Sequence, residues 1–213
     1  LAGSVKNAKI NNCTVQGTMV SAASGNFAYA GGLIGKTEGE KTYVTNCVAD
    51  TPVKAASTAY HAVSGGLIGY SGGSNLVANC AALGNVEASG KSSDYNKMAA
   101  GGLIGYASFL VENCYAAGNV TLTNSASDQS AYAGALIGNQ GGGVAVDSHY
   151  NKNSTLTVND EAAMVVAVGN AKKWAYSDKN KVTAEDTDTK AFAATMNAGI
   201  SESALAATDT YLT

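Results

Sequence analysis

The side chains of this chain that could catalyse a reaction or hold a metal are few. Its two histidines, His61 and His149, do not form the H-E-x-x-H pattern of zinc peptidases. We expect both histidines at solvent-facing loops or corners. Zinc sites use cysteines two to four residues apart, whereas steps of 34, 33 and 34 residues separate Cys13, Cys47, Cys80 and Cys114. The sequence therefore predicts no catalytic residue, no metal site and no cofactor.

The carboxylates give no stronger signal. Glycan-cleaving enzymes need paired carboxylates, but most acidic residues here are scattered: Glu38, Glu40, Asp50, Glu87, Asp94 and Glu112. Glu185, Asp186 and Asp188 lie close together without the D-x-[DN]-x-[DN]-G calcium loop, and the start of a helix accounts for them. We expect a module that is not an enzyme, with a carbohydrate-active β-helix enzyme as the alternative.

Tyrosines are the best candidates for ligand binding, because their rings suit sugar and protein surfaces. Tyr70 and Tyr106 follow equivalent glycine phrases, so we expect them to stack in a column flanked by Lys36 and Asn139. A second row is predicted on the loops: Tyr60, Tyr95 and Tyr132. Stacking that only stabilises the fold stays open as the alternative.

The elements that must position these tyrosines are set by a repeat. Gly31–Gly35 reads Gly-Gly-Leu-Ile-Gly and recurs at 65–69 and 101–105, with an altered copy at 134–138. An Asn-Cys pair recurs in phase, as Asn12, Asn46, Asn79 and Asn113 each precede a cysteine, and Asp147-Ser148 follows. A valine or methionine lies six residues after each cysteine: Met19, Val53, Val86 and Val120. Repeats of this length predict stacked units that share a core.

Short runs of β-branched and leucine residues, broken by glycine and asparagine, predict strands. We expect three strands in each coil of an all-β, right-handed parallel β-solenoid of about five coils. The asparagines are expected in left-handed backbone conformation at a corner, with their amides hydrogen-bonded along the stack. Stacked cysteines lie within disulfide distance, but parallel neighbours point the same way, so we expect four buried, reduced thiols.

The repeat fades after about Tyr150, which divides the chain into a solenoid at 1–150 and a C-terminal extension and cap at 151–213. Glu161–Val168 is apolar enough for a strand or two. Thr183–Gly199 has the pattern of a helix, so we expect a small, partly helical cap over the last coil.

Composition excludes several partners. The 213 residues carry a net charge of -3, and every basic side chain is a lysine. Without arginine, nucleic acid is not an expected partner, and no apolar stretch is long enough for membrane insertion. The chain lacks a starting Met and a signal peptide, so we expect a piece of a longer, processed protein.

The phrase G-G-L-I-G-Y followed by V-x-N-C-Y-A-x-G-N-V resembles the GLUG repeat, most clearly at Gly101–Tyr106 with Val111–Val120. Phe192–Gly199 is similar to a segment that often closes such arrays. The resemblance implies a secreted or cell-surface bacterial protein, either adhesin-like or the non-catalytic part of an immunoglobulin A metallopeptidase-like protein. It implies a spacer, adhesion or binding module whose partners are a host protein or glycan and other domains of the parent chain. A module that presents substrate to a peptidase domain is the alternative.

Overall fold

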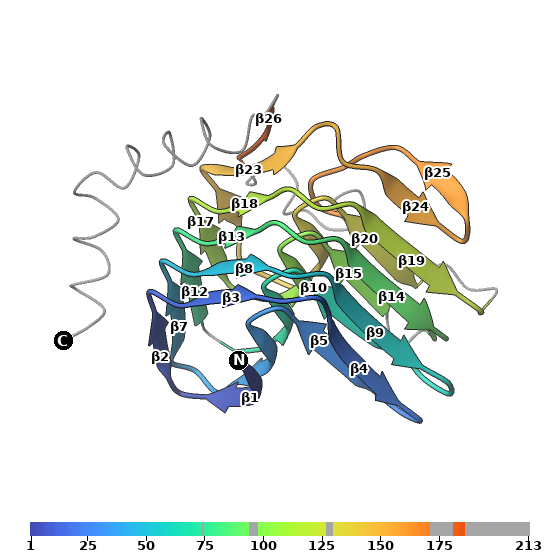
Figure 1. Ribbon diagram of the computed structural model, residues 1–213, viewed down its shortest axis with the longest axis horizontal. Helices are drawn as coiled ribbons and strands as arrows, with labels where there is room; N and C mark the ends of the chain where they lie inside the picture. Colours follow the sequence, from blue (N-terminus) through green and yellow to red (C-terminus); the bar gives the residue numbers. More distant parts are fainter. Residues whose placement is uncertain (74, 94–97, 127–129, 171–180, 186–213) are drawn as a thin grey trace.

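The computed structural model describes residues 1–73, 75–93, 98–126, 130–170 and 181–185, which form a β-solenoid of about five coils (Figure 1). Each of the first four coils contributes one strand to each of five sheets, which we label A to E in chain order, and the described part of the fifth coil adds strands to sheets A to D. The coil therefore has five strands, and our prediction of three was wrong. The two additional strands come from the variable segment before each glycine phrase and from a division of the run around the asparagine corner.

The strands of the five sheets stack in parallel from coil to coil. Sheet A contains β1 (Ala2–Lys6), β6 (Ile34–Glu38), β11 (Ile68–Ser71), β16 (Ile104–Ala107) and β21 (Ile137–Gln140). Sheet B contains β2 (Lys9–Asn11), β7 (Thr42–Thr45), β12 (Asn75–Ala78), β17 (Leu110–Glu112) and β22 (Ala145–Val146). Sheet C contains β3 (Thr14–Gln16), β8 (Val48–Asp50), β13 (Ala81–Ala82), β18 (Tyr115–Ala116), β23 (Ser148–Asn151) and β26 (Val182–Glu185).

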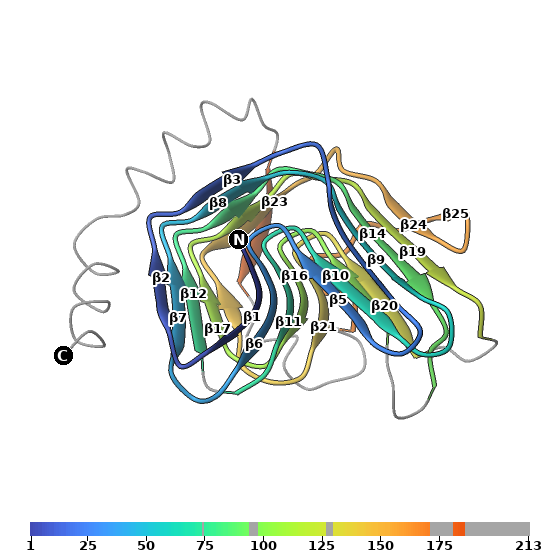
Figure 2. The same ribbon diagram turned by 60° about the horizontal axis from the view of Figure 1, so that its bottom comes forward.

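Sheets D and E form an arm beside the first three sheets (Figure 2). Sheet D contains β4 (Val20–Ser24), β9 (Val53–Ser57), β14 (Val86–Gly90), β19 (Val120–Asn124), β24 (Leu156–Val158) and the antiparallel β25 (Glu161–Ala163). Sheet E contains β5 (Ala28–Gly31), β10 (Ala62–Gly65), β15 (Met98–Gly101) and β20 (Ala131–Gly134). The turn from sheet E to sheet A has two residues in every coil, whereas the connection from D to E has three, four, seven and six.

The glycine phrase divides the interior into two hydrophobic cores. Leu33 and Ile34 belong to the core between sheets A, B and C, whereas Val53 and Ala55 belong to the core between D and E. A Cβ atom on Gly66 would overlap the carbonyl oxygen of the equivalent glycine one coil above and lie 2.7 Å from Ala82 Cβ. The second glycine is therefore required in the first three copies, where another phrase lies directly above, whereas the last copy has Ala135 at this position.

The asparagine corner is confirmed. Asn46 and Asn79 have φ values of +54°, and the equivalent Asn12, Asn113 and Asp147 also have positive φ. The amide nitrogen Nδ2 of Asn113 donates to Oδ1 of Asn79 at 2.7 Å, and Asn79 donates to Asn46 at 3.2 Å. Asn46 donates to Asn11 rather than to Asn12. The shared left-handed backbone conformation places these side chains above one another, and the ladder provides hydrogen-bond partners for their amides.

The cysteine column is confirmed as well. Cys47, Cys80 and Cys114 are buried and Cys13 is partly buried, and all four are free thiols. Each buried thiol donates to the carbonyl oxygen two residues earlier, at 3.1–3.2 Å. Ser148 continues the column, with its hydroxyl 2.9 Å from the carbonyl oxygen of Val146. Burial raises the pKa of the Cys80 thiol, so it stays protonated.

One member of the predicted valine column is misplaced. Val20, not Met19, pairs with Val53, and Met19 is exposed. The first coil has one more residue than the others between its cysteine and sheet D, which moves Met19 out of register.

Stacking continues beyond Tyr150, where the sequence repeat fades. Val168 forms a parallel bridge with Ile137, and Asn170 Nδ2 donates to Asn139 Oδ1 at 2.7 Å. Glu161–Ala163 forms a strand, as its apolar character predicted. Val182–Glu185 is a strand that pairs with β23, so the predicted helix does not begin at Thr183. The rest of that helix and the cap lie outside the described residues.

Candidate ligand-binding surface

The outer face of sheet A carries the predicted tyrosine column. Tyr70 pairs in register with Lys36 below and with Tyr106 above, and Tyr106 pairs with Asn139. The rings of Tyr70 and Tyr106 stack with centroids 4.7 Å apart and planes 7° apart. The parallel register places equivalent side chains directly above each other, so this part of the sequence prediction is confirmed.

Tyr29, on the face of sheet E that is turned towards sheet A, joins this column. Its ring centroid lies 5.2 Å from that of Tyr70, and Lys36 Nζ lies 5.6 Å and 5.9 Å from the centroids of Tyr29 and Tyr70. Lys36 also forms an ion pair with Glu38 at 2.6 Å. The hydrogen bond to Lys36 lowers the pKa of Glu38, which keeps the pair charged. Lysine and two tyrosine rings thus form one polar-aromatic group.

Three further rings extend the group towards the tip of the arm. His61 lies 5.9 Å from Tyr29 and 4.7 Å from Phe27, and Phe27 lies 5.4 Å from Tyr60, all between ring centroids. We call the six rings the aromatic cluster: Phe27, Tyr29, Tyr60, His61, Tyr70 and Tyr106. Sequence reasoning missed Phe27, Tyr29 and His61 as members. The available signal was the position of Phe27 and Tyr29 two residues apart, which places both on one face of a strand.

His61 is buried, which corrects the prediction of a solvent-facing histidine. Only 8% of its surface is exposed, and its Nε2 atom lies 3.5 Å from the hydroxyl oxygen of Tyr29. Its Nδ1 atom is buried without a hydrogen-bond partner in the part of the chain that the structure describes. Burial lowers the pKa of His61, because the charged imidazolium would lose its hydration. The ring therefore packs as a neutral aromatic side chain.

The predicted row of loop tyrosines does not form as expected. Tyr132 lies on β20 rather than on a loop, and only 8% of its surface is exposed. Tyr132 belongs to a strand because sheet E extends up to the first glycine of the phrase, Gly134. Tyr60 lies between β9 and β10, within the aromatic cluster. Tyr95 lies outside the described residues.

The cluster offers a ligand both ring surfaces and hydroxyl groups. Phe27 and Tyr60 are each 44% exposed. Tyr70 and Tyr106 use one ring face against each other, and burial raises the pKa of both phenols, so their hydroxyls are neutral. The exposed apolar rings can stack against a sugar or a side chain, and the neutral hydroxyls beside them can exchange hydrogen bonds with it.

Among the described residues, no three side chains of His, Cys, Asp or Glu lie close enough to hold a metal ion. The same described residues contain no helix that is long and apolar enough to cross a membrane.

Fold and surface together define a non-globular repeat protein of the parallel β-solenoid class. The chain contains the GLUG motif, whose family model matches residues 97–121. A comparison with curated proteins found no match. Among solved structures, a candidate immunoglobulin A1 protease from Bacteroides ovatus is similar, with a TM-score of 0.58 and 19% identity. The similarity covers 86% of this chain and 53% of that one, so this chain spans about half the length of that protein.

Proposed function

We propose that this chain is a non-catalytic solenoid module of a secreted or cell-surface bacterial protein, and that it binds a protein or glycan through the aromatic cluster. The observation that carries the proposal is the cluster itself. Six rings from sheets A and E and from the β4–β5 and β9–β10 connections pack together outside the two hydrophobic cores, and Phe27 and Tyr60 are the rings most open to solvent. Exposed aromatic rings beside hydroxyl groups are typical of contact sites.

The structural neighbour favours a second candidate function. A similar fold occurs in a protein described as a candidate immunoglobulin A1 protease. On this alternative, the module presents an immunoglobulin substrate to a peptidase domain elsewhere in the parent chain. The same aromatic cluster would then contact the immunoglobulin rather than a glycan.

Binding assays distinguish these functions. The purified chain is tested on a glycan array and, by surface plasmon resonance, on immobilised immunoglobulin A1. The variant Phe27→Ser/Tyr60→Ser removes the two most exposed rings of the cluster. The matched control is Met19→Ser/Met164→Ser, which removes two apolar side chains that are 57% and 71% exposed elsewhere.

A glycan or immunoglobulin signal that the cluster variant loses and the control keeps supports the corresponding function. Equal binding by all three proteins contradicts a role for the cluster. Absence of any signal contradicts the binding function and leaves a spacer. A reducing-sugar assay on each bound glycan tests the enzyme alternative, for which we expect no product. Antibody labelling of intact source cells tests the surface location.

A further inference from the structure

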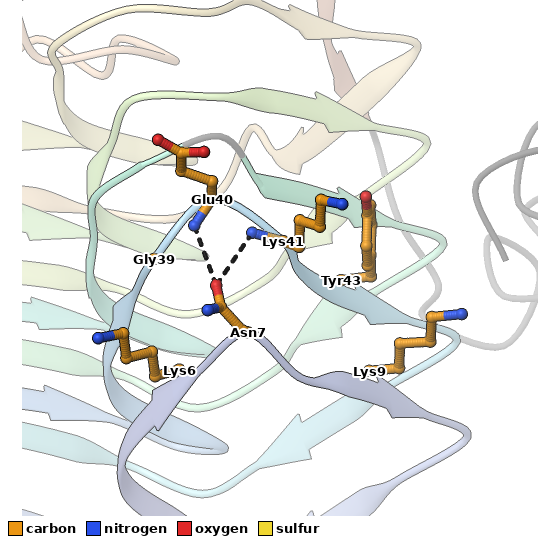
Figure 3. Close-up of a pocket in the computed structure, with 7 residues that line it drawn as sticks. All are labelled: Lys6, Asn7, Lys9, Gly39, Glu40, Lys41 and Tyr43. Carbon is orange, nitrogen blue, oxygen red and sulfur yellow. Dashed lines mark hydrogen bonds between the residues drawn. The ribbon is translucent and has the colours of Figure 1, made fainter. Parts of the chain in front are cut away.

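A hollow of about 620 Å³ lies at the corner between sheets A and B in the first two coils (Figure 3). It is bounded by the turn between β1 and β2 and by the turn between β6 and β7. The hollow is distinct from the aromatic cluster, and its size falls within the range of about 300–1,000 Å³ typical of small-ligand sites.

The floor of the hollow is a fixed piece of backbone. Asn7 has a φ of +50°, and its Oδ1 atom accepts hydrogen bonds from the backbone N–H groups of Glu40 at 3.1 Å and Lys41 at 3.4 Å. Gly39 has a φ of +82°, and a Cβ atom there would overlap Asn7 Oδ1. The glycine and the asparagine therefore hold the backbones of the two turns together.

The side chains around this floor are mostly cationic. Lys6, Lys9 and Lys41 line the hollow together with the Tyr43 ring, against the single carboxylate of Glu40. Figure 3 shows that the Glu40 carboxylate points away from Asn7. Within the described residues, no carboxylate oxygen lies within 4 Å of the amine of Lys6 or Lys41. The lining of the hollow thus carries more positive than negative charge, although the net charge of the chain is -3.

Glu38 pairs in register with Lys6, but its carboxylate forms an ion pair with Lys36 at 2.6 Å. Lys36 is the main cause of the lowered pKa of Glu38, and Lys6 is the smallest cause. Three ammonium groups around a concave surface attract an anionic ligand. Lysine binds an anion as a point charge, without the planar two-point geometry of arginine.

We propose that this hollow binds an acidic sugar through its carboxylate or sulfate group. The lysines would contact the anionic group, and the Tyr43 ring and the amide of Asn7 would contact the sugar. A concave site of this size fits one or two sugar units, whereas nucleic acid is disfavoured by the chain's negative net charge and lack of arginine. The proposal goes beyond the function proposed above and does not depend on the aromatic cluster.

The test measures binding of the whole chain to four polymers by biolayer interferometry. Polygalacturonate carries carboxylates, heparin carries mainly sulfates, dextran is neutral, and poly-glutamate is an acidic peptide. The test variant is Lys6→Gln/Lys9→Gln/Lys41→Gln. The control, Lys91→Gln/Lys152→Gln/Lys181→Gln, removes the same charge from exposed positions elsewhere. Circular dichroism establishes that each variant is folded.

We expect polygalacturonate or heparin to bind and dextran not to bind. The test variant should weaken that binding about tenfold or more, the equivalent of one lost charged contact, whereas the control should change it less than about twofold. Polygalacturonate and heparin show which acidic group is preferred. Lack of binding to both, an equal loss in the control variant, or equally tight binding of poly-glutamate would each overturn the proposal.

Discussion

Tyr70 and Tyr106 lie on neighbouring strands of sheet A, with their ring centroids 4.7 Å apart and their planes 7° apart. The sequence distance between them is one repeat, and the parallel register converts that distance into direct contact. The same relationship holds along the asparagine column from Asn46 to Asn113 and in the cysteine column, so these repeated residues contact their own copies.

The tyrosine stack should show measurable coupling. In a double-mutant cycle with Tyr70→Leu and Tyr106→Leu, we expect a coupling free energy of unfolding of about 0.5–1.5 kcal/mol, because the rings interact beyond their burial. Chemical denaturation of the four proteins measures it. Lys36→Met with Tyr106→Leu is the control, since these residues are two coils apart and their effects should add. Equal coupling in both cycles would contradict a specific ring contact.

The asparagine corner can be separated into backbone and side-chain contributions. Asn79→Gly keeps access to the φ of +54° but removes the amide, whereas Asn79→Ala loses both. We expect Asn79→Ala to lower the free energy of unfolding by about 1 kcal/mol more than Asn79→Gly, because a left-handed conformation strains alanine. Thermal and chemical denaturation measure both variants. Equal stability of the two would show that the conformation carries no cost.

The second glycine of the first three phrases should tolerate no side chain, unlike the last copy, which has Ala135 at this position. Gly66→Ala places a Cβ atom on the backbone of the coil above and near Ala82, so we expect loss of more than about 3 kcal/mol, or an insoluble protein. Gly25→Ala is the matched control, since its Cβ atom would meet nothing within 4 Å. Melting temperatures of the two variants give the comparison. A stable Gly66→Ala protein would mean that neighbouring coils can move apart.

His61 should make the protein less stable in mild acid. Its folded-state pKa is below the ordinary value of about 6.5, so the unfolded chain takes up the proton first. Its contribution is complete above about pH 6.5 and is lost as the pH falls towards the lowered pKa. His61→Phe keeps an aromatic ring without the proton, so its melting temperature should change less between pH 7 and pH 5. Identical pH profiles for both proteins would exclude His61 as the cause.

The four thiols should differ in reactivity. Cys13 is partly buried and the other three are fully buried, so a thiol reagent should modify the native protein at Cys13 first. In denaturant without reductant, we expect four free thiols. Cys13→Ser is the control and should remove only the early reaction. Fewer than four thiols in protein purified under argon and never treated with reductant would contradict the free column.

The residues that occupy identical places in every coil were predictable, because a column of identical side chains is visible in one dimension. The stacked tyrosines, the asparagine corner and the buried cysteines all follow from in-phase spacing. Met19 shows the limit of this approach. One additional residue in the first coil shifts the register, so that Val20 takes the place that the six-residue spacing assigns to Met19.

Contacts between different sheets were not predictable in the same way. Tyr29 meets Tyr70 because sheets E and A are joined by a two-residue turn, and His61 is buried by rings from another coil. The stacking of Asn170 on Asn139 was also missed, because Gly169-Asn170 is all that remains of the glycine phrase in the last part of the solenoid. The lysine hollow combines residues from two turns that share no motif.

The unequal connections from sheet D to sheet E have a practical consequence. They vary from three to seven residues, while the turn from E to A is always two. Added length at the tip of the arm leaves the register of every coil intact, since loop closure costs little for a few more residues. The arm is therefore the place to graft foreign peptides, such as epitopes, and its four D–E connections would hold the inserts in an ordered array.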